Sequence, residues 1–203
     1  MSPETFPRTF VPAAADLGDW EQIEPLLQQL LEREIGSPGE LEQWLLDESE
    51  LSACISEERS ERYIAMTCDT ADKAKEQAYL HFLENIAPRA KPYFHKLNEK
   101  YVASEHRAGL DSERYGVLDR EVEAEIELFR EDNIPLQTEV AKLAQQYQKI
   151  IGAMTVEYGG EERTLPQMAK YLEETDREVR QEAWERVAAR RLQVVLPLVV
   201  DQP

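Results

Sequence analysis

The sequence of 203 residues contains only two cysteines, Cys54 and Cys68, and no long apolar run. Two cysteines are too few for a disulfide framework, and their separation does not fit a CxxC metal or redox motif. The longest apolar segment, 194–200, contains Pro197 and is far shorter than the roughly 20 residues that a membrane-spanning helix needs. The N-terminus lacks the basic and apolar regions of a secretion signal. We therefore expect a cytoplasmic protein with reduced thiols and no membrane association.

Positive charge is also scarce, because 41 acidic side chains face only 23 basic ones and the formal net charge is -18. A field of this sign repels the phosphates of nucleic acids and anionic lipids, so neither is an expected partner. Hydrophobic residues make up 42% of the chain, which is enough to form a buried core. The acidity therefore indicates the solvated surface of a soluble, folded protein.

Catalytic motifs are absent from the sequence as well. The three histidines, His81, His95 and His106, do not form the HExxH motif of zinc peptidases. The segment that begins at His81, His-Phe-Leu-Glu-Asn, resembles the inverted motif HxxEH until Asn85 replaces the second histidine. An ordinary pair of helix-surface side chains is the better interpretation. The sequence thus predicts no catalytic, cofactor-binding or metal-binding residue.

Other candidate sites have ordinary structural explanations. The pair Gly159-Gly160 is flanked by glutamates and lacks the GxxxxGK[ST] pattern of a phosphate-binding loop. The tryptophans Trp20, Trp44 and Trp184 lie at helical spacing among apolar residues, which favours core packing. Runs of glutamate are typical of solvated helix faces.

Apolar residues recur at helical spacing through most of the chain, which predicts a mainly α fold of antiparallel helices and helical hairpins. One small β-hairpin is expected near residues 154–164, because strand-favouring residues flank the Gly159-Gly160 turn. The expected organisation is an extended N-terminal segment over 1–18, a helical subdomain over 19–103, a polar loop over 104–116, a helical region with the hairpin over 117–192, and an atypical apolar tail over 193–203.

Local signals place the helix ends. Capping residues are predicted at Asp19, Ser37, Thr70 and Thr175, and Gly36 is expected to end the first helix. Two prolines, Pro88 and Pro92, are expected to kink or split the third helix. A later helix carries an apolar stripe, which consists of Leu136, Val140, Leu143, Tyr147, Ile150 and Ile151.

Several segments, in their order and spacing, resemble the N-terminal half of the oligoendopeptidase F family of thimet-oligopeptidase-like zinc metallopeptidases. The likeness covers most of residues 8–192. The segments that carry it are Tyr63–Thr70, Arg114–Arg120, Leu128–Leu136, Gly152–Tyr158, Thr164–Met168 and Thr175–Trp184.

The resemblance implies a mostly helical, cytoplasmic endopeptidase that cuts short peptides in an enclosed channel. Its zinc would be held by HExxH and a downstream glutamate in the C-terminal half, so no catalytic residue of the family carries over to this chain and no zinc is expected to bind here. What carries over is a scaffold role, in which the N-terminal helices form one wall of the channel and limit access to short peptides.

The apolar tail over 193–203 departs from the family pattern, which indicates either a frameshifted or prematurely ended chain or a genuine short protein with a buried C-terminal strand. Three functional hypotheses remain open: an N-terminal scaffold fragment that is inactive alone, a stand-alone non-catalytic helical module that binds peptides or a protein, and a split enzyme with a separately encoded C-terminal half. The fragment hypothesis predicts exposed apolar surface where the missing half would dock.

Overall fold

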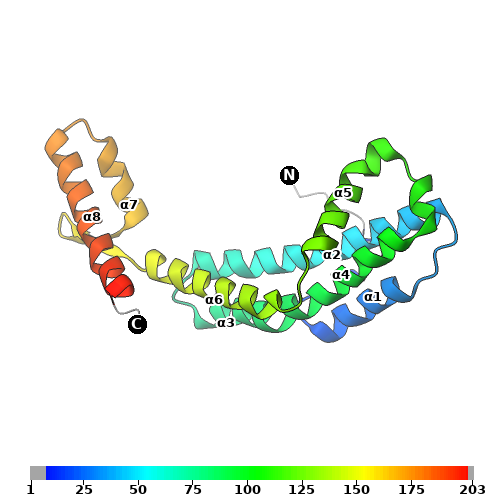
Figure 1. The fold of residues 1–203 in the computed structure, drawn as a ribbon. Helices are drawn as coiled ribbons and strands as arrows, with labels where there is room; N and C mark the ends of the chain where they lie inside the picture. The colour runs from blue at the N-terminus through cyan, green and yellow to red at the C-terminus, as the bar shows by residue number, and fades with distance from the viewer. Residues whose placement is uncertain (1–7, 201–203) are drawn as a thin grey trace. The chain divides into compact units, whose positions relative to one another are not determined.

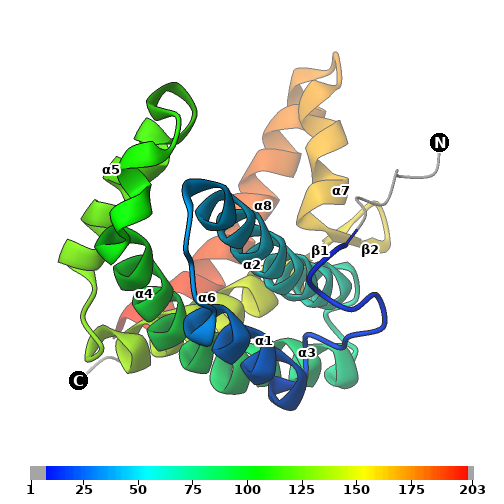
Figure 2. The same ribbon diagram turned by 90° about the vertical axis from the view of Figure 1, so that its right-hand side faces the viewer.

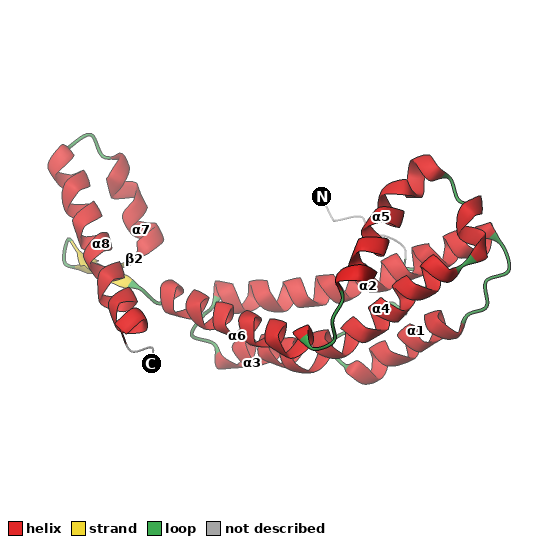
Figure 3. Ribbon diagram, viewed as in Figure 1, coloured by secondary structure: helices red, strands yellow, loops and turns green. Residues whose placement is uncertain are grey.

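The computed structural model describes residues 8–200, with side chains as far as residue 193. Most of this part is helical, and its strands are confined to one hairpin (Figures 1 and 3). The predicted mainly α fold with one small antiparallel hairpin is therefore confirmed. The elements in chain order are α1 (Trp20–Glu32), α2 (Pro38–Cys68), α3 (Lys73–His81), a π-helical turn η1 (Phe82–Ile86), α4 (Ala87–Ala103), a 3-10 turn η2 (Glu105–Gly109), α5 (Ser112–Leu128), α6 (Asn133–Gly152), β1 (Thr155–Tyr158), β2 (Glu161–Thr164), α7 (Leu165–Ala169), a 3-10 turn η3 (Lys170–Glu173) and α8 (Arg177–Val200).

The chain divides into two compact units, Met1–Leu143 and Ala144–Pro203. The division falls inside α6 rather than at the polar segment 104–116 that the sequence suggested. That segment is also more ordered than a loop, because η2 occupies its first half. Asp111 then starts α5 by accepting a hydrogen bond from the backbone N–H of Glu113 at 2.9 Å.

The core of the first unit forms where α1 packs against α2 and α4, which run beside it (Figures 1 and 2). Trp44 on α2 is 1% exposed, and its indole N–H donates to the carbonyl oxygen of Leu30 on α1 at 2.8 Å. Burial of large apolar side chains on all three helices supplies most of the stabilisation of this unit. The fully buried members include Ile23, Leu27, Leu30, Leu41, Trp44, Leu51, Leu97 and Tyr101.

Two of the predicted helix starts agree with the structure and two do not. Asp19 caps α1 through the N–H of Glu21, and Ser37 caps α2 with Pro38 in its first turn. Thr70 does not cap α3; Asp72 does so, because its carboxylate reaches the backbone N–H groups of Ala74 and Lys75. Similarly Asp176, not Thr175, accepts from the backbone at the start of α8.

The prolines act as predicted in part. A π-helical turn separates α3 from α4. Pro88 occupies the first turn of α4, where a backbone N–H would have no acceptor within the helix, so its missing N–H costs no hydrogen bond. Pro92, however, lies inside α4 without dividing it. Gly36 does not end α1, which stops at Glu32.

The second unit contains the hairpin, α7, η3 and α8. Both glycines of the turn have positive φ, 64° for Gly159 and 79° for Gly160, as a two-residue primed turn requires. Thr164 and Gln167 form a reciprocal capping box at the start of α7. Val156, Met168 and Ala183 bring the hairpin, α7 and α8 into one small core.

Helix α8 continues as far as Val200, so the alternative of a strand in the apolar tail is wrong over 193–200. The rest of the predicted tail, 201–203, lies outside the described residues. Trp184 on α8 is 63% exposed, which contradicts its predicted place in a core.

Candidate docking surface

The histidines are held by ordinary neighbours in the first unit. His81 lies on α3, where the side-chain amide of Asn85 approaches its Nδ1 at 3.3 Å and its carbonyl oxygen at 3.2 Å. Glu84 instead forms an ion pair with Lys142 at 3.0 Å. The two residues that resembled an inverted zinc motif, His81 and Glu84, therefore contact different partners.

The remaining metal-ligating side chains are dispersed. His95 stacks on Phe129, with ring centroids 3.9 Å apart, and His106 contacts Glu105. Cys54 and Cys68 lie at distant points of the same helix, about 21 Å apart along its axis at the usual rise per residue. Burial raises the pKa of the Cys54 thiol, which keeps it protonated. Within residues 8–200, no three His, Cys, Asp or Glu side chains are grouped to hold a metal ion.

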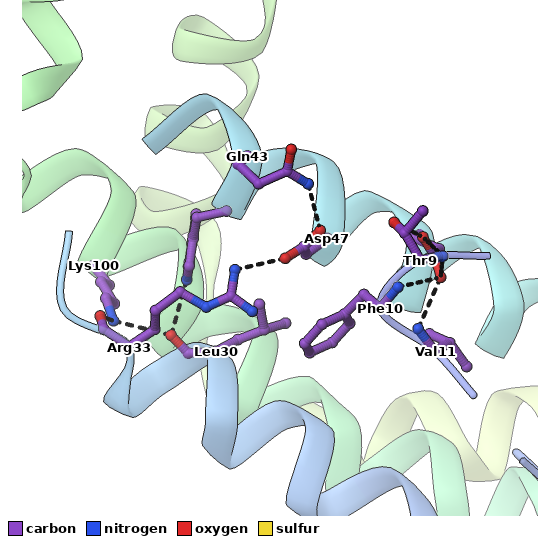
Figure 4. A network of polar contacts seen from close by, with 10 residues as sticks. Thr9, Phe10, Val11, Leu30, Arg33, Gln43, Asp47 and Lys100 are labelled. Carbon is purple, nitrogen blue, oxygen red and sulfur yellow. Dashed lines mark hydrogen bonds and ion pairs between the residues drawn. The ribbon is translucent and has the colours of Figure 1, made fainter. Parts of the chain in front are cut away.

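Within the first unit, a network of polar contacts joins the segment before α1 to α2, and the end of α1 to α2 and α4 (Figure 4). The Glu50 carboxylate accepts hydrogen bonds from the successive backbone N–H groups of Thr9, Phe10 and Val11. Burial raises the pKa of Glu50, but these donors outweigh burial and hold the pKa below its usual range. The segment before α1 is thereby fixed against α2.

The second part of this network lies at the C-terminal end of α1. The ammonium of Lys100 donates to the carbonyl oxygens of Leu30, Leu31 and Arg33 at 2.9, 2.7 and 2.5 Å. These carbonyls belong to the last turn of α1 and to its C-cap residue Arg33, where no further helical N–H groups are available as donors. Arg33 itself donates to the buried Asp47 at 2.6 Å.

A cavity of about 140 Å³ lies between α2, α4 and α5 of the first unit. Three carboxylates, those of Glu48, Glu121 and Glu125, contribute to its lining. Burial first, and then the charge of Glu125, raise the pKa of Glu48 to about 7. The cavity contains no arrangement of a nucleophile and a base, and its features concern stability rather than chemistry.

The feature that stands out on the first unit is the apolar stripe on α6, which we define as Leu136, Val140 and Leu143. These side chains are 63%, 65% and 61% exposed. Ile134 is buried, and Ala141 packs against the cluster of Met66, Tyr79 and Leu83; both lie on another face of α6. Because a helix turns about 100° per residue, the α6 stripe points opposite to that packed face. Isolated exposed apolar side chains are common, whereas three on one face of a helix make the α6 stripe the candidate docking surface.

Sequence reasoning found the α6 stripe as a periodic pattern but could not tell which apolar face the rest of the chain covers. It missed Lys100 and Glu50, whose partners lie 39 to 70 residues away. No local signal marks such long-range contacts. In the part of the chain that the structure describes, no helix is long and apolar enough to cross a membrane.

The arrangement of helices followed by a hairpin and further helices is shared with part of a larger protein of known structure. A crystal structure described as that of an oligoendopeptidase F superposes with a TM-score of 0.81 and 25% identity over 95% of this chain. The aligned region is 34% of that protein, so this chain spans about a third of its length.

The family of the chain follows from its sequence. The Peptidase M3 N-terminal domain matches residues 11–129, which is more than half of the chain. The chain therefore belongs to the Peptidase M3 N-terminal domain family, and the resemblance noted in the sequence is confirmed. No curated protein sequence matches the chain.

Proposed function

We propose that this chain is the N-terminal scaffold portion of an oligoendopeptidase F-like zinc metalloendopeptidase that acts on short peptides. The observation that carries the proposal is the match of residues 11–129 to the Peptidase M3 N-terminal domain, supported by the oligoendopeptidase F fold. The helices of the first unit would form a wall that restricts access to short, unfolded peptides. The setting would be the cytoplasm, without nucleic-acid or membrane partners.

The chain is proposed to have no peptidase activity alone. Hydrolysis of a peptide bond by a zinc-activated water requires zinc ligands and a general base close together. His81 and Glu84 are the nearest approach to such a set, and their side chains have other partners. We therefore expect the zinc of the complete enzyme to be held by residues outside this chain.

A direct assay tests this expectation. The purified chain is incubated with zinc and a quenched fluorescent peptide, with and without a chelator, beside a His81→Ala variant of equal purity. We expect no chelator-sensitive turnover from either protein. Chelator-sensitive turnover by the wild-type chain that His81→Ala abolishes would show a zinc site in the chain and refute the proposal.

A second candidate is a stand-alone helical module that binds peptides or a protein partner without cutting them. It is favoured by the first unit's own continuous core around Trp44, which joins α1, α2, α4 and α5. This module would be monodisperse, would unfold cooperatively and would not bind an apolar dye. Strong dye binding that Val140→Glu reduces would instead favour the scaffold, because it places uncovered apolar surface on α6.

A further inference from the structure

The α6 stripe is a built surface rather than a chance cluster. Its members follow each other by four and then three residues along α6. This spacing is the repeat of helices that pack side by side, with Leu and a β-branched residue in alternating positions. The pattern fits a helix as the partner of α6.

The surroundings of the α6 stripe lower the cost of covering it. Between Leu136 and Gln146 the charged residues are Glu139 and Lys142, which form an ion pair with each other at 3.2 Å. A solvated helix face in a chain with 32% charged residues would carry more charge than this. Burial of this face would therefore leave neither of these two charged side chains without a partner.

Helix α6 is apolar on two opposite sides. Ile134 and Ala141 face the first unit, while the α6 stripe faces away from it. A helix with apolar residues on both sides belongs between two layers of protein. Among the residues that the structure describes, the first unit supplies the layer that packs against Ile134 and Ala141.

The occupant of the second layer can be named by class. This chain aligns over 95% of its length with an oligoendopeptidase F, yet it accounts for only 34% of that polypeptide. We propose that the α6 stripe receives an apolar helix from the portion of an oligoendopeptidase F-like polypeptide that this chain does not cover. The inference rests on the proposed scaffold function and adds the contact surface and the type of partner element.

Co-expression tests the inference. The full chain carries an affinity tag, and the uncovered portion of the matched oligoendopeptidase F is expressed beside it without a tag. The variant Val140→Glu/Leu143→Glu introduces two charges into the α6 stripe. The matched control is Ile64→Glu, which introduces a charge at a 57% exposed apolar position on α2. Circular dichroism checks that every variant keeps its helix content and melting temperature.

We expect the wild-type chain and Ile64→Glu to retain the co-expressed portion. Val140→Glu/Leu143→Glu should weaken binding by about 100-fold or more, since unpaired charges would be buried. Equal retention by all three proteins would overturn the inference while leaving the scaffold proposal intact, because the contact would then lie elsewhere. Retention by none of them would overturn both. A wild-type dimer in light scattering that the double variant converts to a monomer would also overturn it, by assigning the stripe to a second copy of this chain.

Discussion

Removal of the Lys100 ammonium is expected to destabilise the first unit from the end of α1. The side chain donates to three carbonyl oxygens, and its ammonium lies 5.8 Å from the ring centre of Trp44. Lys100→Met removes this charged group and keeps an apolar side chain. In this variant the carbonyl oxygen of Leu30 still accepts a hydrogen bond from the indole N–H of Trp44. The carbonyl oxygens of Leu31 and Arg33 lose the hydrogen bond from Lys100. Hydrogen bonds to a charged group contribute about 1.5–3 kcal/mol each, and they are not additive.

One opposing effect reduces this figure. Burial, and then the nearby charge of Arg33, hold the pKa of Lys100 below its usual range, so the ammonium is placed there at a cost. We therefore expect Lys100→Met to lower the free energy of unfolding by about 2 kcal/mol. The measurement is urea unfolding followed by circular dichroism and by tryptophan fluorescence, recorded in a Trp184→Phe background so that the signal comes from Trp20 and the buried Trp44 of the first unit.

Lys96→Met is the matched control. Lys96 lies on the same helix and is exposed, and its ammonium is 5.9 Å from the ring centre of Tyr93. Such an exposed contact contributes about 0.5–1 kcal/mol at most. If Lys100→Met cost no more than Lys96→Met, the carbonyls would be satisfied by water and our account of how α1 ends would be wrong.

Three further predictions concern the same chain. Glu50→Gln should lower the free energy of unfolding by about 1–2 kcal/mol at pH 7. The difference should shrink on acidification, because the stability that a lowered pKa provides is lost as the pH falls through that pKa. Urea unfolding across a series of decreasing pH values measures this, and a cost that does not change with pH would contradict it. For Glu48, whose pKa is raised to about 7, the pH dependence of stability is opposite to that of Glu50. The free energy of unfolding is highest below the unfolded-state pKa and falls as the pH rises through 7. Glu48→Gln should therefore stabilise the protein by about 2 kcal/mol at pH 8 and little at pH 4.5, and a destabilised variant at pH 8 would refute the reasoning. Gly160→Ala should lower the free energy of unfolding by about 1–2 kcal/mol through the positive φ of this residue alone, because a Cβ there meets no atom within 4 Å. Gly116→Ala in α5 should instead stabilise the protein. The changes in melting temperature of the two variants should therefore have opposite signs.

The elements predicted well are those specified within a few residues of themselves. The hairpin follows from two adjacent glycines between strand-favouring segments, and α2 begins at Ser37 and Pro38 as its sequence indicates. In both cases the residues that determine the local backbone conformation are close together in the sequence. Competition between neighbouring caps explains the errors at Thr70 and Thr175, since an aspartate lies one or two residues later in each case.

The features missed from the sequence depend on contacts between distant residues. Gly36 looked like the end of α1, but Lys100 on α4 satisfies the last carbonyls of a helix that has already stopped at Glu32. Trp184 lies at core spacing and yet is mostly exposed. A hydrophobic period gives the face that prefers to leave water, but it does not identify what covers that face.

Helix α6 shows what this limit means for function. Two groups of apolar residues in the first unit differ in what surrounds them: Trp44 and its neighbours are enclosed by helices of the unit, whereas the side chains of the α6 stripe are exposed. Both patterns look alike in the sequence, because amphipathic periodicity is the same for a core and for an interface. Only the structure separates them, since it uses Ile134 and Ala141 to attach α6 and leaves Val140 outside. The proposed scaffold role requires both properties, a core that holds the helices of the unit together and one helix that is apolar on a second side.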